Sequence, residues 1–379
     1  MTKEEYLSSH LITYIGNKRK LVNYIEEEVL KIKNTLNKTE LVSLDGFAGS
    51  GVVSRMLKYH SRILFVNDIE PYSNIINQCY LSNPNQIKRE QINTYIQELN
   101  DLEYNKEGII CQEYSPKNTD DIKKDERAFY TRENALIIDT IRNKIDDYPT
   151  DYFPYLISPL LVKASINTNT SGVFKGFHKK NDIGHFGGKE EQNTTSRITK
   201  QIVLESPIYS DQSHKCKVFF RNMDINKLIE NLSLIDVAYL DPPYNQHPYG
   251  SNYFMLNTIL ENKITGNLSK VSGIPNNWKK SEYNYKHSAE KSLKKLLSNL
   301  KAKYIILSYN DEGIITKDQL VSIFKCLDLS YTFREIKYDT YKGCKNLQDR
   351  NNKVTEYIWI LHPLYNIEEP YLLVSMDKW

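Results

Sequence analysis

The apolar residues of the first quarter of the chain alternate between helical and extended periodicity. They recur at helical spacing over residues 21–33, and the next short apolar run is typical of a buried strand that ends at Asp45. The glycine-rich turn DGFAGSG follows, then a stretch with an apolar helical face, and then a second strand-like run, RILFVND. This order predicts a parallel α/β sheet, whose ligands bind beyond the carboxyl ends of the strands.

The alternation is lost over residues 84–200, which are polar, charged and irregular, and it resumes afterwards. Further strands are expected in CKVFFRNMD, LIDVAYLDPPY, YIILSYNDEG and EYIWIL, with an amphipathic helix around residues 289–300. We therefore expect one α/β core formed by residues 1–105 and 201–379. Residues 106–200 are expected to form an insertion that is mainly helical or irregular.

Composition limits the class of protein. A net charge of +3 and a pI near 8.3 indicate no global attraction to nucleic acid, so any basic surface must be local. Five scattered cysteines without a Cys-x-x-Cys pair favour neither a disulfide framework nor a zinc site, and the histidines show no His-Glu-x-x-His spacing. No apolar run approaches the roughly 18 residues of a membrane helix. We expect a soluble, cytoplasmic protein without a metal centre or a membrane partner.

The turn DGFAGSG lets the backbone approach a ligand closely, and the helix that follows favours a negative or electron-rich group at its N-terminus. It lacks the full Gly-x-Gly-x-x-Gly spacing, which argues against a pyrophosphate. Asp68 ends the next strand, 17 residues after Gly51, where a carboxylate can bind both hydroxyls of a ribose. Together these features predict a nucleoside-bearing cofactor. The alternative is a tight turn at Gly49 and Gly51 and a helix cap at Asp68.

The segment LDPPYNQHPYG carries the most specific chemistry. Pro242 and Pro243 fix the backbone and remove two N–H donors, so the Asp241 carboxylate and the Pro242 carbonyl remain as rigid acceptors after an apolar strand. Tyr244 adds a flat face suited to stacking on a heterocycle. The matching ligand is the exocyclic amino group of a base, whose hydrogens two acceptors can hold. The alternative is a plain turn with a buried tyrosine.

Five segments in order, YIGNKRKL, DGFAGSG, ND, RNMD and DPPY, resemble those of the adenine-specific DNA methyltransferases that use S-adenosylmethionine. The resemblance runs from about residue 12 to 361. The long insertion between the cofactor and catalytic motifs is typical of the Dam-like alpha group. The segments NQHPYGSNYFMLNTI, ILSYNDEG and KVTEYIWIL also resemble the DNA adenine methylases of restriction-modification systems.

The resemblance implies a Rossmann-like, mostly parallel sheet with one reversed strand, and methyl transfer from S-adenosylmethionine to adenine N6 without a metal. It implies that Asp241, Pro242, Pro243 and Tyr244 are catalytic. The cofactor would contact Tyr14, Gly16, Lys18, Asp45, Phe47, Gly49, Gly51, Asp68, Asp224 and Asp241. Asn17 departs from the family's usual aromatic-x-Gly-Gly-Lys motif. On the residues alone, a solvated basic turn is an equal alternative for Tyr14 and Lys18.

Two basic regions are candidates for contact with double-stranded DNA. Residues 163–200 hold seven Lys or Arg against three Asp or Glu, interleaved with Phe174, Phe177 and Phe186, which suits phosphate contact and some base readout. The second region is a loop in the catalytic half. The candidate DNA-binding residues are Lys175, Lys179, Lys180, Lys189, Arg197, Lys342, Lys345 and Arg350. The alternative for both regions is a solvated charged surface.

Three other functions remain open on the residues alone. Methylation of cytosine N4 or of an RNA base would use similar chemistry, although serine in place of Asp241 would favour cytosine. A catalytically silent DNA-binding module is the third, and the intact set of Lys18, Asp68, Asp241 and Tyr244 argues against it. We expect a site-specific DNA adenine methylase of a prokaryote or phage, with a cognate restriction endonuclease as a possible partner.

Overall fold

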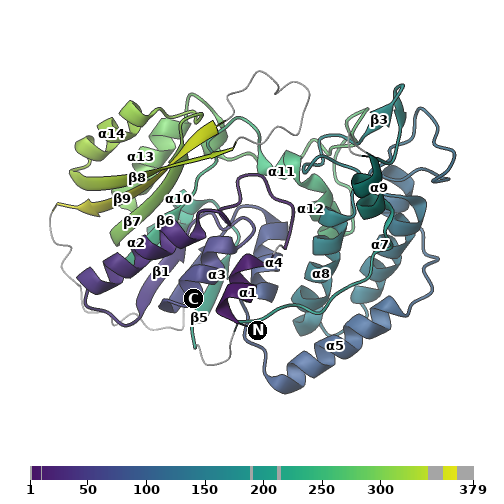
Figure 1. Ribbon diagram of the computed structural model, residues 1–379, viewed down its shortest axis with the longest axis horizontal. Helices are drawn as coiled ribbons and strands as arrows, with labels where there is room; N and C mark the ends of the chain where they lie inside the picture. Colours follow the sequence, from purple (N-terminus) through teal and green to yellow (C-terminus); the bar gives the residue numbers. More distant parts are fainter. Residues whose placement is uncertain (1, 10, 188–190, 211–214, 340–352, 365–379) are drawn as a thin grey trace.

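The computed structural model describes residues 2–9, 11–187, 191–210, 215–339 and 353–364. Within them, a seven-stranded sheet forms the centre of an α/β core, and a group of helices lies beside it (Figure 1). The strands, in spatial order, are β5 (Lys217–Arg221), β2 (Ser61–Asn67), β1 (Leu41–Asp45), β6 (Ile235–Leu240), β7 (Ala302–Asn310), β9 (Lys353–Pro363) and β8 (Leu329–Asp339).

The sheet is parallel except at one strand. Strand β9 pairs antiparallel with both β7 and β8, whereas the other neighbouring strands pair in parallel. The expected Rossmann-like sheet with one reversed strand is therefore confirmed. Strands β1, β2, β5, β6, β7 and β9 lie where the apolar runs predict them, and β8 is a strand that the sequence pattern did not predict.

Both faces of the sheet are covered by helices, which explains why β6 is buried along its whole length. Val237 and Tyr239 pack with residues of α2 and α3, and Ala238 and Leu240 pack with residues of α10 and α13 on the opposite face. The helices of the core are α1 (Lys3–Ser8), α2 (Val22–Thr35), α3 (Val52–Lys58), α4 (Pro71–Tyr80), α10 (Ile225–Leu228), α13 (Ala289–Asn299) and α14 (Lys317–Cys326), with the short turns η2 (Ile229–Asn231) and η3 (Glu282–Asn284).

The remaining elements form a helical lobe, seen on the right of Figure 1. It comprises α5 (Gln86–Asn100), α6 (Ile109–Glu113), α7 (Arg132–Ile145), η1 (Thr150–Tyr152), α8 (Phe153–Ile166), α9 (Glu191–Thr199), α11 (Tyr249–Asn252), α12 (Phe254–Glu261) and the short strands β3 (Lys179–Lys180) and β4 (Ile183–Gly184). One apolar cluster joins α5, α7, α8 and α12 to α4 of the core. Helices that precede residue 106 in the sequence and helices that follow residue 200 therefore pack against the insertion.

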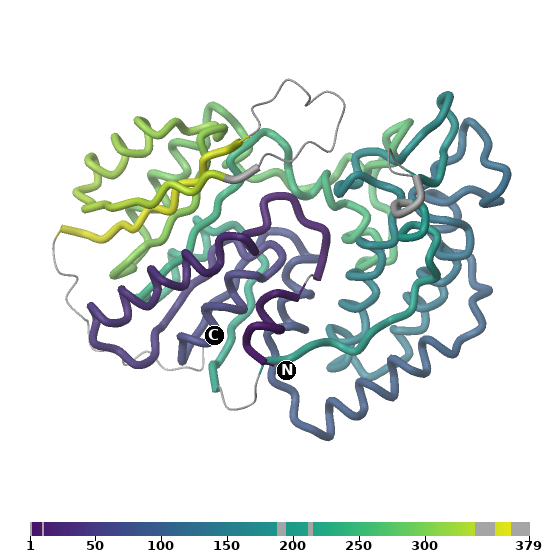
Figure 2. The backbone as a smooth tube through the Cα atoms, in the orientation of Figure 1, coloured from purple at the N-terminus to yellow at the C-terminus, as the bar shows by residue number. Residues whose placement is uncertain are grey.

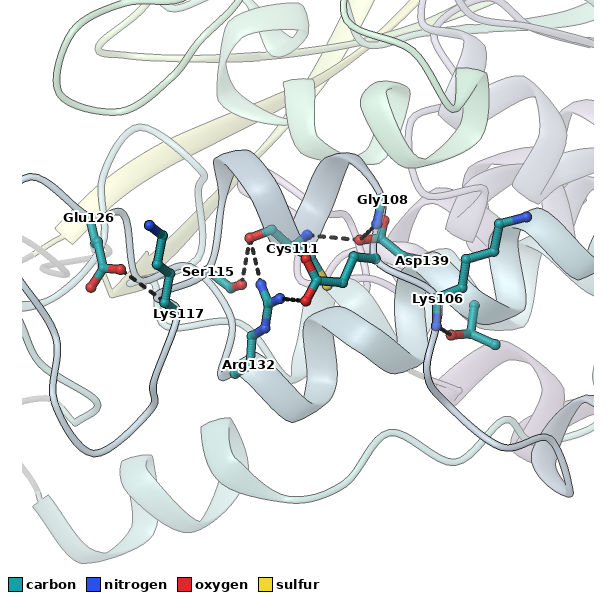
Figure 3. A network of polar contacts seen from close by, with 10 residues as sticks. Lys106, Gly108, Cys111, Ser115, Lys117, Glu126, Arg132 and Asp139 are labelled. Carbon is teal, nitrogen blue, oxygen red and sulfur yellow. Dashed lines mark hydrogen bonds and ion pairs between the residues drawn. The ribbon is translucent and has the colours of Figure 1, made fainter.

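A polar network fastens α6 to α7 inside this lobe (Figure 3). The Asp139 carboxylate accepts hydrogen bonds from the backbone N–H groups of Gly108, Ile110 and Cys111, at 2.8 to 3.1 Å. Arg132 donates to the Cys111 carbonyl at 3.0 Å. The bonds to Asp139 satisfy N–H groups at the start of α6 that have no partner within the helix.

The N-terminal segment runs between the core and the helical lobe before it enters α2 (Figure 2). Its apolar residues Leu11 and Ile12 belong to the cluster of the lobe, whereas Tyr6 and Leu7 pack into the core. The segment thus contacts both parts of the molecule and carries residues 14–18 to the edge of the sheet.

Candidate active site

The carboxyl ends of β1, β2, β5 and β6 meet at one edge of the sheet, beside a cavity. Most of the predicted cofactor residues line it: Tyr14, Gly16, Lys18, Asp45, Phe47, Gly49, Asp68, Asp224 and Asp241. Residues from the first 18 positions and from beyond residue 220 therefore share one site.

The glycine turn and Asp68 are joined by hydrogen bonds. The Gly49 N–H donates to Asp68 Oδ2 at 2.7 Å, and the Glu70 N–H donates to Oδ1 at 2.8 Å. Gly49 has a φ of +50°, and a Cβ at this position would lie 2.9 Å from the ring of Tyr14. Burial raises the pKa of Asp68, and the two amides oppose this rise. The carboxylate is therefore held in a fixed orientation at the cavity.

Gly51 belongs to the same glycine turn but is placed differently. It does not line the cavity. Its φ is +74°, and a Cβ would lie 2.1 Å from Asn77 Oδ1. The turn and its packing against α4 therefore require glycine here, as in the alternative interpretation of this residue.

Asp45, at the end of β1, is 1% exposed. Its Oδ2 accepts a hydrogen bond from Ser54 Oγ at 2.6 Å, and its Oδ1 has no hydrogen-bond partner in the described part of the chain. Burial raises the pKa of this carboxyl to about 7, against the hydrogen bond from Ser54. Asp45 Oδ1 is thus a buried acceptor at the cavity that a bound donor group would satisfy.

Asp241 forms an ion pair with Lys18. The Lys18 ammonium lies 3.0 Å from Asp241 Oδ1 and 3.1 Å from Glu356 Oε1, and these three side chains are 5%, 18% and 0% exposed, respectively. Burial would lower the pKa of Lys18, but the two carboxylates raise it well above its usual value. Burial raises the pKa of Asp241 to about 6, although Lys18 opposes the rise. Near neutral pH the pair is therefore ionised.

The other residues of the DPPY segment differ in whether they line the cavity. Pro243 lines the cavity, whereas Pro242 is buried and does not. The Tyr244 ring lies outside the lining, with Lys18 Nζ 5.7 Å from its centroid and the Tyr309 ring edge-on at 6.3 Å. The Tyr244 carbonyl accepts a hydrogen bond from the Ile314 N–H at 2.8 Å. The segment is thus fastened at its carboxyl side.

Tyr14 is held in an aromatic stack. Its ring centroid lies 4.9 Å from those of Tyr249 and Tyr253, at interplanar angles of 9° and 15°. The Ile15 N–H donates to Tyr253 Oη at 2.7 Å, and Tyr249 Oη donates to the Ile15 carbonyl at 3.2 Å. Residues 14–18 are therefore positioned by α11 and its flanks rather than forming a solvated turn.

Sequence reasoning missed four residues of this region: Glu70, Tyr249, Tyr253 and Glu356. The first two line the cavity, and burial raises the pKa of Glu70 to about 7. Asp224, which was predicted, caps α10 by accepting a hydrogen bond from the Asn226 N–H at 2.9 Å. The signal for Glu356 is an acidic residue within the apolar row Val354, Ile358 and Ile360 of a strand.

Comparison with known proteins agrees with this geometry. The family of D12 class N6 adenine-specific DNA methyltransferases matches residues 14–323. The chain belongs to this family. It is therefore an enzyme that methylates adenine N6 in DNA, and the alternatives of a cytosine or RNA target and of a silent module are set aside.

Similar proteins extend this D12 match over nearly the whole chain. The type II methyltransferase M.NlaIII of Neisseria lactamica is 30% identical over 360 residues, which cover 93% of this chain and 99% of that protein. M.CviAII of Paramecium bursaria Chlorella virus 1 is 30% identical over 356 residues, with 93% and 98% covered. A solved structure of a putative RNA methyltransferase from Pyrococcus horikoshii aligns with 90% of the chain at 10% identity and a TM-score of 0.28, too low for any argument.

The candidate DNA-binding residues of this methyltransferase have mixed surroundings. Lys175, Lys179 and Lys180 are exposed, and Lys175 Nζ lies 3.2 Å from His247 Nδ1 in the loop after the DPPY segment. Arg197 instead donates to the backbone carbonyls of Ile166 and Thr168, which gives it a structural role inside the lobe. Lys189, Lys342, Lys345 and Arg350 lie outside the described residues.

The phenylalanine residues of the same region differ in their exposure to solvent. Phe174 is 2% exposed and packs near Phe129 and Phe254, so its side chain belongs to the interior of the lobe. Phe177 and Phe186 are partly exposed.

Two further properties concern the described residues as a whole. Of the helices in the described ranges, none has the length and apolar character needed to span a bilayer. Within the same ranges, no three His, Cys, Asp or Glu side chains are grouped as metal ligands.

Proposed function

We propose that this enzyme takes its methyl group from S-adenosylmethionine and that Asp241 and the Pro242 carbonyl hold the target amine. The observation that carries this assignment is the Lys18–Asp241 ion pair at the cavity that the glycine turn and Asp68 also line. The relatives named type II methyltransferases support a role as the modification enzyme of a restriction-modification system.

The cavity fits such a methyl donor. Gly49 leaves room beside Tyr14 where a side chain would collide, and the rigid Asp68 carboxylate can accept hydrogen bonds from ribose hydroxyls. The unpaired Asp45 Oδ1 suits an ammonium group, such as that of the methionine part. When bound, S-adenosylmethionine would supply a methyl group on a positively charged sulfur. The Phe47 side chain lines the same cavity and offers an apolar surface to the adenine ring.

The catalytic contribution of the protein is an oriented pair of acceptors. Lys18 fixes Asp241 Oδ1, so the second carboxylate oxygen is free to accept a hydrogen from adenine N6. Holding both hydrogens of the amine favours a tetrahedral nitrogen whose lone pair can attack. N6 would take the methyl carbon as the bond between this carbon and the donor sulfur breaks, and it would become positively charged before it releases one proton to water. The carboxylate stabilises this charge because it is ionised and largely buried.

The target adenine must leave the DNA helix to reach these groups, at a cost of a few kcal/mol. We assign Tyr244 to stack on the extruded base. Residues 106–200, with the exposed Lys175, Lys179 and Lys180, are assigned to DNA recognition. The 3.2 Å contact between Lys175 and His247 supports this assignment, because it brings the basic segment next to the catalytic loop.

Replacing Asp241 with alanine tests the assignment. We expect the single-turnover rate of DNA methylation to fall by a factor of about 10² to 10³, the usual effect of removing an oriented polar group. Binding of the methyl donor, measured by calorimetry, should persist. Asp318→Ala on the exposed face of α14 is the matched control and should leave the rate unchanged.

Two outcomes would contradict the assignment. Turnover near the wild-type rate in Asp241→Ala would show that the carboxylate does not act on the amine. Loss of donor binding together with loss of turnover would place Asp241 in the cofactor site instead. Sequencing of the DNA treated with the wild-type enzyme would then identify the modified base and its recognition sequence.

A further inference from the structure

Glu356 is a fully buried acid in the reversed strand of the sheet. It lies near the start of β9, in register with Asn310 of β7 and Ile336 of β8. Because β9 is antiparallel to β7, its first residues reach the same sheet edge as the carboxyl ends of the parallel strands. The neighbours of Glu356 on this face of β9 are the apolar residues Val354, Ile358 and Ile360. A charged side chain in such a row is costly to bury unless it has a specific partner.

The partner is the lysine of the active site. Lys18 Nζ lies 3.1 Å from Glu356 Oε1, 3.0 Å from Asp241 Oδ1 and 3.3 Å from the carbonyl oxygen of Gly16. The ammonium group thus forms ion pairs with two carboxylates and donates a hydrogen bond to one carbonyl. One positive and two negative charges give the group a net charge of −1. Lys18 alone would neutralise Asp241, whereas the second carboxylate leaves an unbalanced negative charge beside the reacting amine.

We propose that Glu356 is a positioning residue for methyl transfer, which fixes Lys18 and preserves the acceptor strength of Asp241 toward adenine N6. This inference rests on the proposed role of Asp241. A net negative charge stabilises the transient positive charge on N6 before its proton leaves. Glu356 need not touch the substrate, because it acts through Lys18 and through its own charge.

Other groups also face Asp241 and belong in the electrostatic balance. Asp45 approaches from β1, and Tyr239, Tyr244 and Tyr249 surround the pair. Burial raises the pKa of Tyr239 and of Tyr249 well above the usual value, so both stay neutral. The charge of Glu356 raises the pKa of Asp241, in addition to the effect of burial, and Lys18 lowers it.

The size of the Glu356 effect follows from the geometry. Both carboxylate oxygens lie about 3 Å from one nitrogen, so they are at most about 6 Å apart. At this separation, removing one charge moves the titration of the other by roughly 0.5 to 2 pH units, between a water-like and a protein-like dielectric. The wild-type rate should fall on the acid side with a midpoint near pH 6, because the pKa of Asp241 is about 6.

The test is the pH dependence of the single-turnover methylation rate in Glu356→Gln and Glu356→Asp. Glutamine keeps an acceptor oxygen for Lys18 but removes the charge, so the acid midpoint should move to lower pH by roughly 0.5 to 2 units, and the plateau rate should fall about tenfold. Aspartate keeps the charge at a shorter reach, so the midpoint should stay in place while the plateau falls. Donor binding and thermal unfolding are measured on both variants.

An unchanged midpoint in Glu356→Gln, with or without a lower rate, would make Glu356 a purely structural residue and overturn the inference. If that variant does not fold, a wild-type plateau rate in Glu356→Asp would overturn it instead. The Asp241→Ala variant distinguishes a failure of the role proposed for Asp241 from a failure of the role proposed for Glu356. If it retains turnover, the proposed role of Asp241 fails, whereas an inactive Asp241→Ala beside an unshifted Glu356→Gln refutes only the role of Glu356.

Discussion

The Lys18→Met variant gives the sharpest test of the charge balance at the sheet edge. Lys18 is 5% exposed, and its ammonium separates two carboxylates, one of them fully buried. Methionine retains a similar apolar stem and removes only the charged end. The variant therefore leaves Asp241 and Glu356 facing each other without a cation, with little loss of packing.

The cost is expected to be large because the lost partner is buried. Removing one member of a buried ion pair destabilises a protein by about 3–5 kcal/mol, since the remaining charge stays uncompensated. The cost should shrink as the pH falls. Lys18 lowers the pKa of Asp241, so its removal raises that pKa and makes the folded variant bind a proton more tightly. For each unit by which this pKa rises, the variant regains about 1.4 kcal/mol of unfolding free energy. This gain is complete at a pH below the Asp241 pKa of both the wild-type protein and the variant.

Urea-induced unfolding at about pH 8 and about pH 5.5 measures both effects. We expect Lys18→Met to lose several kcal/mol at the higher pH and clearly less at the lower one. Lys123→Met is the matched control, because the Lys123–Asp121 pair has side chains that are 63% and 64% exposed. Its loss should be about 0–1 kcal/mol. Equal losses for Lys18→Met at the two pH values would show that packing, not charge, explains its instability.

Two other variants test the cofactor and base sites. Gly49→Ala places a Cβ 2.9 Å from the Tyr14 ring at a φ of +50°, so we expect weaker binding of the methyl donor by calorimetry; Gly176→Ala, with no atom within 4 Å of the added Cβ, should bind normally. For Tyr244, alanine should lower the methylation rate more than phenylalanine, because stacking needs the ring and not the hydroxyl; equal losses in the two variants would refute the stacking role.

Much of the core could be predicted because its signals are local. The run of β6 is apolar except at Asp236 and is buried at every position, as expected for a strand that is covered on both faces. Asp45, Asp68 and Asp241 each follow such a run, and parallel pairing brings the ends of these runs to one edge. The positions of these acids in the sequence therefore contained most of the information about the cavity.

The parts that the sequence did not predict depend on contacts between distant segments. The lobe helices α7 and α8 bury their residues against each other and against α12, so a pattern that looks irregular along the chain becomes regular once these elements pack. Glu356 could be found only as an exception in an apolar row, and its partner Lys18 lies near the other end of the chain. Phe174 lies among basic residues in the sequence, and only the packing of the lobe shows that its own side chain is buried.

The reversed strand also affects when the enzyme becomes competent during its synthesis. Lys18 leaves the ribosome early, Asp241 follows much later, and Glu356 emerges only with β9. A nascent chain that lacks β9 also lacks the Glu356 carboxylate, so Asp241 is the one carboxylate of the pair that Lys18 can still meet. Of the described strands, the last to be translated is therefore the one that supplies Glu356, and the role proposed for this residue predicts that unfinished chains are poor catalysts even when their cofactor pocket has folded.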